Sequence, residues 1–206
     1  MNTQQNILEV GNVSKSFGRK QVLDNITLRI GKGEICSIVG ENDSGKTTLL
    51  RIIVGMIKAD TGFVRFQGSF GYCPQDMQIF NSLSLRENLV FFATAYRLKK
   101  RDIGWKGDLQ KLLEDFQLHK EMDTRVAKLS GGMRQKLNLL LALIHSPELL
   151  ILDEPYAAFD WESYLYFWRL VGALKEEGTS FLIVSHLIYD RKNIDTILEL
   201  REGRLS

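Results

Sequence analysis

The stretch "GENDSGKTT", residues 40–48, decides how the chain around it must fold. It matches the pattern G-x-x-x-x-G-K-[ST], a glycine-bounded loop that ends on lysine and threonine. The apolar run at 35–39 predicts a buried strand before it, and apolar residues at helical spacing predict a helix over 46–57. Backbone N–H groups of such a loop can surround a phosphate. We expect Lys46 to reach the β- and γ-phosphates of a nucleotide and the Thr47 hydroxyl to bind Mg²⁺; the alternative is a turn that caps a helix.

Two further apolar runs end on side chains that can do chemistry. "LLILD" at 149–153 ends on Asp153 and is followed by Glu154, and "SFLIVS" at 180–185 is followed by His186. An open α/β sheet places its ligand chemistry at such strand ends. We expect Asp153 to hold Mg²⁺ through water, and Glu154 to act as the general base on the attacking water. The alternatives are a solvated acidic strand end and a structural histidine.

Composition narrows the class of protein. The chain has 206 residues, 44% hydrophobic and 25% charged, which predicts one domain with a substantial core. A net charge of +2 gives no reason to expect a nucleic-acid partner. The apolar run at 137–144 is too short to cross a bilayer, and "MNTQQNILEV" lacks the regions of a signal peptide. We expect a cytosolic protein, or one that reaches a membrane through a partner. Cys36 and Cys73 are expected to be buried thiols, with a disulfide as the alternative.

Strand and helix patterns alternate along the chain. Further strands are expected at 7–13, 22–30, 61–66, 70–73 and 196–200, and further helices at 85–98, 108–118 and 161–177. This alternation implies an α/β fold with a parallel sheet, and the mostly helical stretch at about 76–147 implies an inserted subdomain.

The segment "LSGGMRQKL", residues 129–137, has two adjacent glycines where a helical pattern begins. Glycine weakens a helix interior by about 1 kcal/mol relative to alanine, so the pair requires a reason. The phosphate loop, "LSGGMRQ" and "LILDEP", in this order and at this spacing, resemble the nucleotide-binding domains of ABC ATPases from Val10 onward. The resemblance implies a P-loop NTPase cassette with a mixed core sheet, an N-terminal antiparallel β-subdomain and an inserted α-helical subdomain. We expect one such domain over residues 1–206, with the helical subdomain at about 76–147.

The resemblance also implies roles for single residues. Phe17 resembles the aromatic residue that stacks on adenine, Gln75 the Q-loop glutamine, Asp160 the D-loop aspartate and His186 the switch histidine that contacts the γ-phosphate. Glu154, His186 and Gln75 are the expected catalytic residues, and Thr47, Gln75 and Asp153 are expected near Mg²⁺. The expected ATP-binding residues are Phe17, Gly40, Glu41, Asn42, Asp43, Ser44, Gly45, Lys46, Thr47, Thr48, Gln75 and Asp153.

In this family two such domains pair head to tail and trap two ATP molecules between them. The expected signature residues, which act on the nucleotide of the partner, are Ser130, Gly131, Gly132 and Gln135. The Ser130 hydroxyl and the N–H groups of both glycines would meet the partner's γ-phosphate, helped by the helix macrodipole. Only glycine lets backbone amides approach that closely.

Three features depart from the family pattern. Asp43 stands where the phosphate loop usually has glycine; aspartate tolerates left-handed backbone, but its charge should weaken ATP binding somewhat. The D-loop reads "AAFD" in place of small and leucine-like residues before its aspartate, which puts the fine geometry of the dimer in doubt. The link at Gly68 and Ser69 between two strands is shorter than in relatives.

We therefore expect the ATP-hydrolysing subunit of an ABC transporter, peripheral at the inner face of the cell membrane and driving separate transmembrane subunits. Its expected partners are ATP, those subunits and a second nucleotide-binding subunit, identical or different, and no nucleic acid. The apolar segment 77–96 beside Gln75 would receive a short helix of the membrane subunit, or belongs to the core; its sequence favours an exporter. The alternatives are a soluble ABC ATPase of a non-transport assembly, such as iron–sulfur cluster assembly, a translation or repair ATPase, and a nucleotide sensor without turnover.

Overall fold

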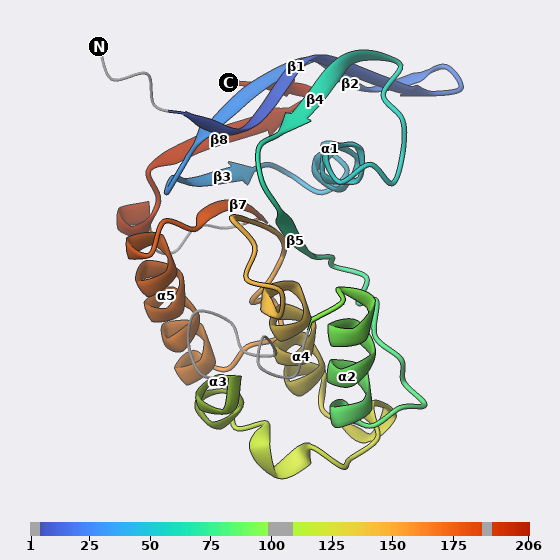
Figure 1. The fold of residues 1–206 in the computed structure, drawn as a ribbon. Coiled ribbons are helices and arrows are strands. Elements are labelled where there is room, and N and C mark those ends of the chain that lie inside the picture. Colours follow the sequence, from blue (N-terminus) through green and yellow to red (C-terminus); the bar gives the residue numbers. More distant parts are fainter. Residues whose placement is uncertain (1–4, 99–108, 187–190) are drawn as a thin grey trace.

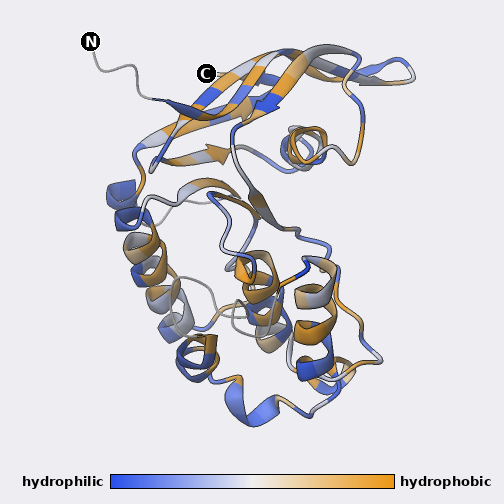
Figure 2. Ribbon diagram, in the orientation of Figure 1, coloured by the Kyte–Doolittle hydropathy of each residue, from blue (hydrophilic) through white to orange (hydrophobic). Residues whose placement is uncertain are grey.

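The computed structural model describes residues 5–98, 109–186 and 191–206, which form two sheets and five α-helices. The first sheet is antiparallel, in the order β2–β1–β4, and lies at the top of Figure 1. Its strands are β1 (Asn6–Phe17), β2 (Lys20–Gly31) and β4 (Thr61–Phe66). Hydrophobic and hydrophilic residues alternate along these strands (Figure 2), as expected for a sheet with one face on the core.

The second sheet has the order β5–β6–β7–β3–β8–β9. Its strands are β3 (Ile35–Val39), β5 (Phe70–Cys73), β6 (Leu149–Asp153), β7 (Ser180–Ser185), β8 (Thr196–Arg201) and β9 (Arg204–Leu205). The first five in the order are parallel, and only β9 runs antiparallel to its neighbour β8. The expected mixed core sheet and antiparallel N-terminal sheet are therefore confirmed.

Two hydrophobic cores lie on opposite faces of the central sheet, because successive strand residues point to opposite sides. In β6, Ile151 packs in the core shared with α1 and the antiparallel sheet. Its neighbours Leu150 and Leu152 pack in the core shared with α2, α4 and α5. Burial on both faces explains why β6 and β7 read as continuous apolar runs.

The helices are α1 (Lys46–Ile53), α2 (Leu85–Ala95), α3 (Leu109–Asp115), α4 (Gly131–Leu143) and α5 (Trp161–Glu176). Short 3₁₀ turns lie at His119–Glu121, Val126–Lys128 and Arg191–Asn193. Figure 1 shows α2, α3 and α4 together at the end of the molecule opposite the antiparallel sheet. Side-chain oxygens cap three helix N-termini: Ser84 for α2, Ser130 for α4 and Asp160 for α5.

Three predicted helices are shorter than the pattern indicated. The helix predicted over 46–57 ends at Ile53, because Gly55 takes a left-handed φ of 78°. The helix predicted over 85–98 ends at Ala95, just before Arg97 with φ 56°. The third, predicted over 108–118, spans Leu109–Asp115, and its expected first residue, Asp108, lies outside the described residues.

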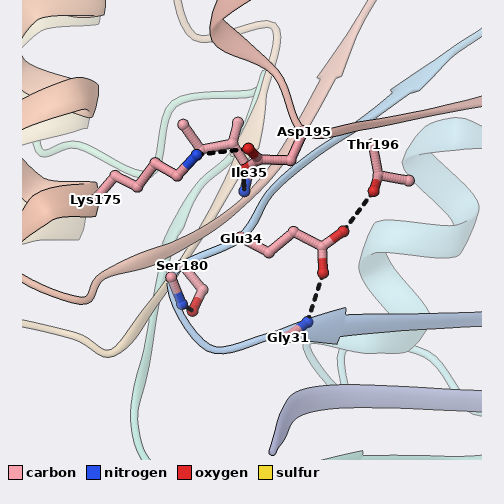
Figure 3. Close-up of polar contacts among 8 residues, drawn as sticks. Gly31, Glu34, Ile35, Lys175, Ser180, Asp195 and Thr196 are labelled. Atoms are coloured by element: carbon pink, nitrogen blue, oxygen red, sulfur yellow. Dashed lines mark hydrogen bonds and ion pairs between the residues drawn. The ribbon is translucent and has the colours of Figure 1, made fainter. Parts of the chain in front are cut away.

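A polar network ties together the starts of the central strands, at the edge opposite the phosphate loop (Figure 3). The Glu34 carboxylate accepts hydrogen bonds from the Thr196 hydroxyl at 2.6 Å and from Gly31 N–H at 2.7 Å. The Asp195 carboxylate accepts from Ile35 N–H at 2.8 Å and pairs with Lys175 of α5 at 2.6 Å. These contacts hold the amino ends of the strands together, and the phosphate loop follows the carboxyl end of β3.

Cys36 and Cys73 are both buried and free, as expected for thiols. Burial raises the pKa of Cys36 to about 12, so this thiol stays protonated. Within the described ranges, no helix is both long and apolar enough to cross a membrane.

Candidate nucleotide-binding site

The carboxyl ends of β3, β6 and β7 meet at one edge of the central sheet. Val39 pairs with Ser185, and Asp153 pairs with Val184, so the residues that follow these strands converge. A cavity of about 450 Å³ opens there. It is lined by Phe17, Lys20, Val22, Asn42, Asp43, Gly45, Lys46, Thr47, Thr48, Gln75, Asp153, Glu154 and His186. The parallel topology thus brings together residues spread over most of the chain.

Lys20 and Val22 also line this cavity, although neither was expected at the site. The tight hairpin after Phe17 pairs this residue with Lys20, and that pairing carries Lys20 to the same mouth. The strands expected at 7–13 and 22–30 do not reach this hairpin, because the observed β1 and β2 extend to Phe17 and from Lys20.

Three expected binding residues, Gly40, Glu41 and Ser44, are not among the lining residues. A Cβ on Gly40 would overlap the carbonyl oxygen of Leu200 and lie 2.8 Å from the Ser44 hydroxyl oxygen. Glycine at position 40 therefore has a packing reason within the chain itself.

Two residues of the phosphate loop, Asp43 and Gly45, have a positive backbone φ angle. Gly45, at the N-cap of α1, has φ 104°, and Asp43 has φ 62°, in the left-handed region that Asp tolerates better than most residues.

The buried Lys46 ammonium donates to the carbonyl oxygens of Gly40 and Glu41, each at 2.6 Å. Desolvation lowers the pKa of Lys46, although the nearby carboxylates of Glu154, Asp153 and Asp43 raise it in part. The ammonium group is therefore held at the start of the loop, where a bound phosphate would compensate its positive charge.

Thr47 and Asp153 form the pair of oxygen donors expected for a metal ion. The Thr47 hydroxyl donates to Asp153 Oδ2 at 3.3 Å, across from α1 to the end of β6. Asp153 is 1% exposed, and burial raises its pKa to about 6. A buried carboxylate with a raised pKa favours a cation beside it.

Glu154 has an unusual backbone and a buried carboxylate. Its φ is 50°, uncommon for a residue other than glycine, and its side chain is 8% exposed. One carboxylate oxygen lies 3.1 Å from His186 Nε2, and the other accepts from the Ser185 hydroxyl at 3.4 Å. Burial raises the pKa of Glu154, while His186 and Lys46 lower it in part. Strain of this kind occurs at functional sites, where surrounding structure holds a side chain in place.

Phe17 and Gln75 flank the cavity with exposed side chains. Phe17 is 54% exposed at the end of β1, and the Lys15 ammonium lies 5.5 Å from its ring centre. Gln75 follows β5 directly and lies in the loop that leads to α2. An exposed aromatic face at the cavity mouth is free to stack on a planar ligand.

The two glycines after Ser130 differ in their surroundings. A Cβ on Gly132 would lie 2.9 Å from the carbonyl oxygen of Ala158, whereas a Cβ on Gly131 would have no described atom within 4 Å. Glycine at position 132 therefore has a packing reason inside the chain, in addition to the expected contact with a partner's nucleotide. Gly131 and the neighbouring Ser130 face open space, and Ser130 Oγ accepts from Met133 N–H at 3.2 Å.

Gln135 and Asp160 are both held by contacts within the chain. Gln135 is 4% exposed, and its amide donates to the carbonyl oxygens of Pro155 at 3.1 Å and Glu154 at 3.4 Å. This contact places the Gln135 side chain against the main chain of Glu154 and Pro155. Asp160 accepts from Ser163 N–H at 2.8 Å, a bond that lowers the pKa of Asp160, and lies 3.7 Å from Lys136 Nζ.

A parallel sheet with a phosphate loop between β3 and α1, and acidic residues at the end of β6, defines a P-loop nucleotide-binding protein. Comparison with known proteins gives the family. The family model described as "ABC transporter" matches residues 23–157. The chain belongs to the ABC transporter family, in which it is an ATP-binding cassette.

Individual relatives agree with this assignment. The chain is 35% identical to ABC transporter G family member 23 of Dictyostelium discoideum, over 97% of this chain and 30% of that protein. It is 32% identical to Nod factor export ATP-binding protein I of Rhizobium meliloti, over 96% of this chain and 62% of that protein. The chain thus spans less than two thirds of the length of both relatives. A dimeric structure of a bacterial ABC transporter cassette matches with a TM-score of 0.85 and 25% identity, over 97% of this chain and 96% of that one.

Proposed function

We propose that this cassette hydrolyses ATP and drives separate transmembrane subunits, as part of an exporter at the inner face of the cell membrane. The observation that carries the proposal is the Glu154 carboxylate, buried 3.1 Å from His186 at the edge of the cavity that also contains Lys46. A base with a raised pKa, close to a phosphate-binding lysine, suits the activation of water for attack on phosphorus. We treat residues 1–206 as one nucleotide-binding domain with a helical subdomain at about 76–147.

In this proposal several of the cavity residues act on different parts of ATP. Phe17 stacks on the adenine ring, and the N–H groups of the phosphate loop surround the phosphates with Lys46. Glu154 accepts a proton from a water molecule as the oxygen of that water bonds to the γ-phosphorus. The bond from the γ-phosphorus to the β,γ-bridging oxygen then breaks. ADP and phosphate are then the products. His186 orients Glu154 and contacts the γ-phosphate.

Three oxygen donors that line the cavity fit Mg²⁺. Thr47 offers a hydroxyl oxygen, Asp153 a carboxylate and Gln75 an amide oxygen, all on one cavity. Hard cations prefer oxygen ligands, and Mg²⁺ is commonly bound by one or two carboxylates plus substrate phosphates. When bound, Mg²⁺ would neutralise charge on the phosphates.

The proposed second cassette would bring Ser130 and Gly131 to the nucleotide of its partner. Both residues are exposed, and the open space beside Gly131 leaves room for a phosphate. They lie at the N-terminus of α4, where backbone N–H groups and the helix dipole favour an anion. Asp160 lies in the same region through its contact with Lys136 of α4.

The proposed contact with the membrane subunit is an apolar surface beside Gln75. Phe80 is 41% exposed, Val90 56% and Phe91 48%, and the Phe80 and Phe91 rings pack edge to face. These large exposed apolar side chains mark a surface that another protein covers. The exporter assignment draws on the sequence of this segment and on the likeness to the Nod factor export protein.

Hydrolysis is tested by measuring the phosphate that the purified chain releases from ATP in the presence of Mg²⁺. Glu154→Gln should reduce release at least 100-fold while ADP affinity stays the same, because only the base is lost. The control is Glu148→Gln, a half-exposed glutamate near Lys32, which should not alter release. Equal rates in wild type and Glu154→Gln, or no release by the wild type, would contradict the proposal.

The transport role is tested by purification with the multi-spanning protein of a neighbouring gene. Phe91→Asp should remove that protein from the purified complex without altering phosphate release. A complex that survives this change would show that the membrane subunit binds another surface.

A further inference from the structure

Helix α4 lies tightly against strand β5 over the length of the strand. A Cβ on Gly71 would overlap the carbonyl oxygen of Ala142, so only glycine permits this approach. Further along the strand, the Asn138 side chain of α4 donates to Pro74 O at 2.8 Å and to Cys73 Sγ at 3.2 Å. These contacts fix α4 relative to the main chain that leads into Gln75.

Asn138 is the one amide in an otherwise apolar stretch of α4, "LNLLLAL" at 137–143. It is 4% exposed, so water does not compete for its donors. A leucine here would bury more apolar surface, and removal of the amide would leave a buried carbonyl oxygen without its donor. The amide therefore specifies the position of one backbone atom, Pro74 O.

The residue after Gln75 is also held, from another helix. Asp76 Oδ2 lies 3.3 Å from Arg51 of α1, the helix that begins at the phosphate loop. Gln75 thus lies between a buried amide contact with α4 and an exposed ion pair with α1. The buried contact is the stronger constraint, because solvent screens the exposed ion pair.

We propose that Asn138 is a positioning residue for Gln75: it fixes the main chain before Gln75 to the same helix that begins at Ser130. This inference rests on the proposed function, in which Gln75 reaches Mg²⁺ and the γ-phosphate. Asn138 touches neither ATP nor metal. Because Ser130 and Asn138 lie about 12 Å apart along one rigid helix, a shift of the signature toward a partner's phosphate moves Pro74 and Gln75 with it.

The test is a double-mutant cycle between Asn138→Leu and Gln75→Ala, with the rate of phosphate release at saturating ATP as the first readout. We expect Asn138→Leu to lower kcat about tenfold when Gln75 is present, as for other residues that orient a metal-site group. On the Gln75→Ala background the same change should lower kcat less than about twofold, because its effect passes through Gln75. ADP affinity should change less than about twofold in both backgrounds.

The matched control is Asn88→Leu. Asn88 is 0% exposed, and its amide donates to Phe80 O at 3.1 Å and Ser84 O at 2.9 Å, away from the cavity. Asn88→Leu should lower the melting temperature of the protein without lowering kcat. Should Asn138→Leu fail to fold, Asn138→Ser, which keeps one donor, replaces it in the same cycle.

The second readout does not depend on turnover. In the Glu154→Gln background, ATP affinity is titrated with and without Mg²⁺; we expect Mg²⁺ to tighten binding, and Asn138→Leu to reduce this gain severalfold, as Gln75→Ala does. A wild type that releases no phosphate would reject the proposed hydrolysis, and this titration would then decide the role of Asn138 alone. Equal kcat losses in both backgrounds, or a Mg²⁺ gain that Asn138→Leu does not alter, would overturn the inference.

Discussion

Asp43 combines a suitable backbone with an unfavourable charge. Its φ of 62° is one that glycine adopts without strain, and its carboxylate lies near the phosphate site with Lys46. Asp43→Gly should therefore keep or tighten ATP affinity, because it removes repulsion between carboxylate and triphosphate. Equilibrium titration with a fluorescent ATP analogue measures this. A clear loss of affinity would mean that Asp43 makes a favourable contact with the nucleotide.

Phe17 is exposed at the cavity mouth and contributes no core packing. Phe17→Ala should weaken ATP binding severalfold and leave the melting temperature unchanged, since stacking of a base on an aromatic ring is worth about 1–3 kcal/mol. The control is Phe91→Ala, an aromatic residue of similar exposure outside the cavity. Equal ATP affinities in wild type and Phe17→Ala would remove Phe17 from the site.

Asp153 makes the metal-free protein less stable as the pH rises. Burial raises the pKa of its carboxyl to about 6 in the folded protein, against a reference value of 3.8 that we take for the unfolded chain. Between these values the unfolded chain loses its proton first, so stability falls with rising pH and the penalty is constant above pH 6. Asp153→Asn keeps an acceptor for Thr47 and removes the titration, which should raise the free energy of unfolding at pH 7 by at most about 3 kcal/mol.

The measurement is urea unfolding of both proteins between pH 4 and pH 8, without nucleotide and with a chelator. The difference between the two proteins should grow from pH 4 to pH 6 and then stay level. A difference that is independent of pH would show that burial does not raise the pKa of Asp153.

At the scale of elements, the start of α4 separates a folding requirement from a binding requirement. Gly132→Ala should destabilise the chain by about 1–3 kcal/mol, because its Cβ would press on Ala158 O at 2.9 Å. Gly131→Ala should leave stability equal or raise it by up to about 1 kcal/mol, because its Cβ meets no described atom and alanine favours a helix. Yet Gly131→Ala should weaken ATP-dependent pairing of cassettes.

Thermal unfolding of both variants measures the effects on stability. Sedimentation in the presence of ATP measures the effect of Gly131→Ala on the pairing of cassettes. If both changes destabilise the monomer equally, the open space beside Gly131 has no functional meaning.

Element boundaries show where sequence patterns lose information. The strands at 35–39, 149–153 and 180–185 match the observed β3, β6 and β7, because burial on both faces requires unbroken apolar runs that end abruptly at the loops. The end of α1 did not match, since Ile57 continues the apolar spacing although Gly55 has already turned the chain. Periodicity reports which face is buried, whereas a helix end depends on a single backbone angle.

At the scale of the whole molecule, the composite site predicts that ATP controls assembly. Glu154→Gln with ATP should elute as a dimer, and the same protein with ADP or without nucleotide should elute as a monomer, because only ATP bridges the two surfaces. Adding Gly131→Asp should abolish the dimer, since a carboxylate would face the γ-phosphate. Size-exclusion chromatography with light scattering, at matched concentration, measures this.

A dimer that survives Gly131→Asp would reject the composite site. A monomer in every nucleotide state would indicate a different chain as the partner, which mixing with a second cassette of the same transporter would reveal.

The sequence by itself determined the fold class and the strand-end residues of the cavity. Asp153 ends one strand, and Glu154 and His186 each follow a strand, and the parallel pairing of these strands must bring their ends together. Lys46 and Thr47 were predictable for a similar reason, as a loop between a strand and a helix has few ways to present its N–H groups. Only the tertiary structure decided which glycine of the signature is needed for packing, that Gln135 faces inward, and that Lys20 and Val22 reach the cavity. The contact of Asn138 with Pro74 joins residues 64 positions apart. No local sequence pattern encodes this contact, because the distance between Asn138 and Pro74 O is set by how closely α4 packs on β5. That packing depends on the side chains that lie between the helix and the strand.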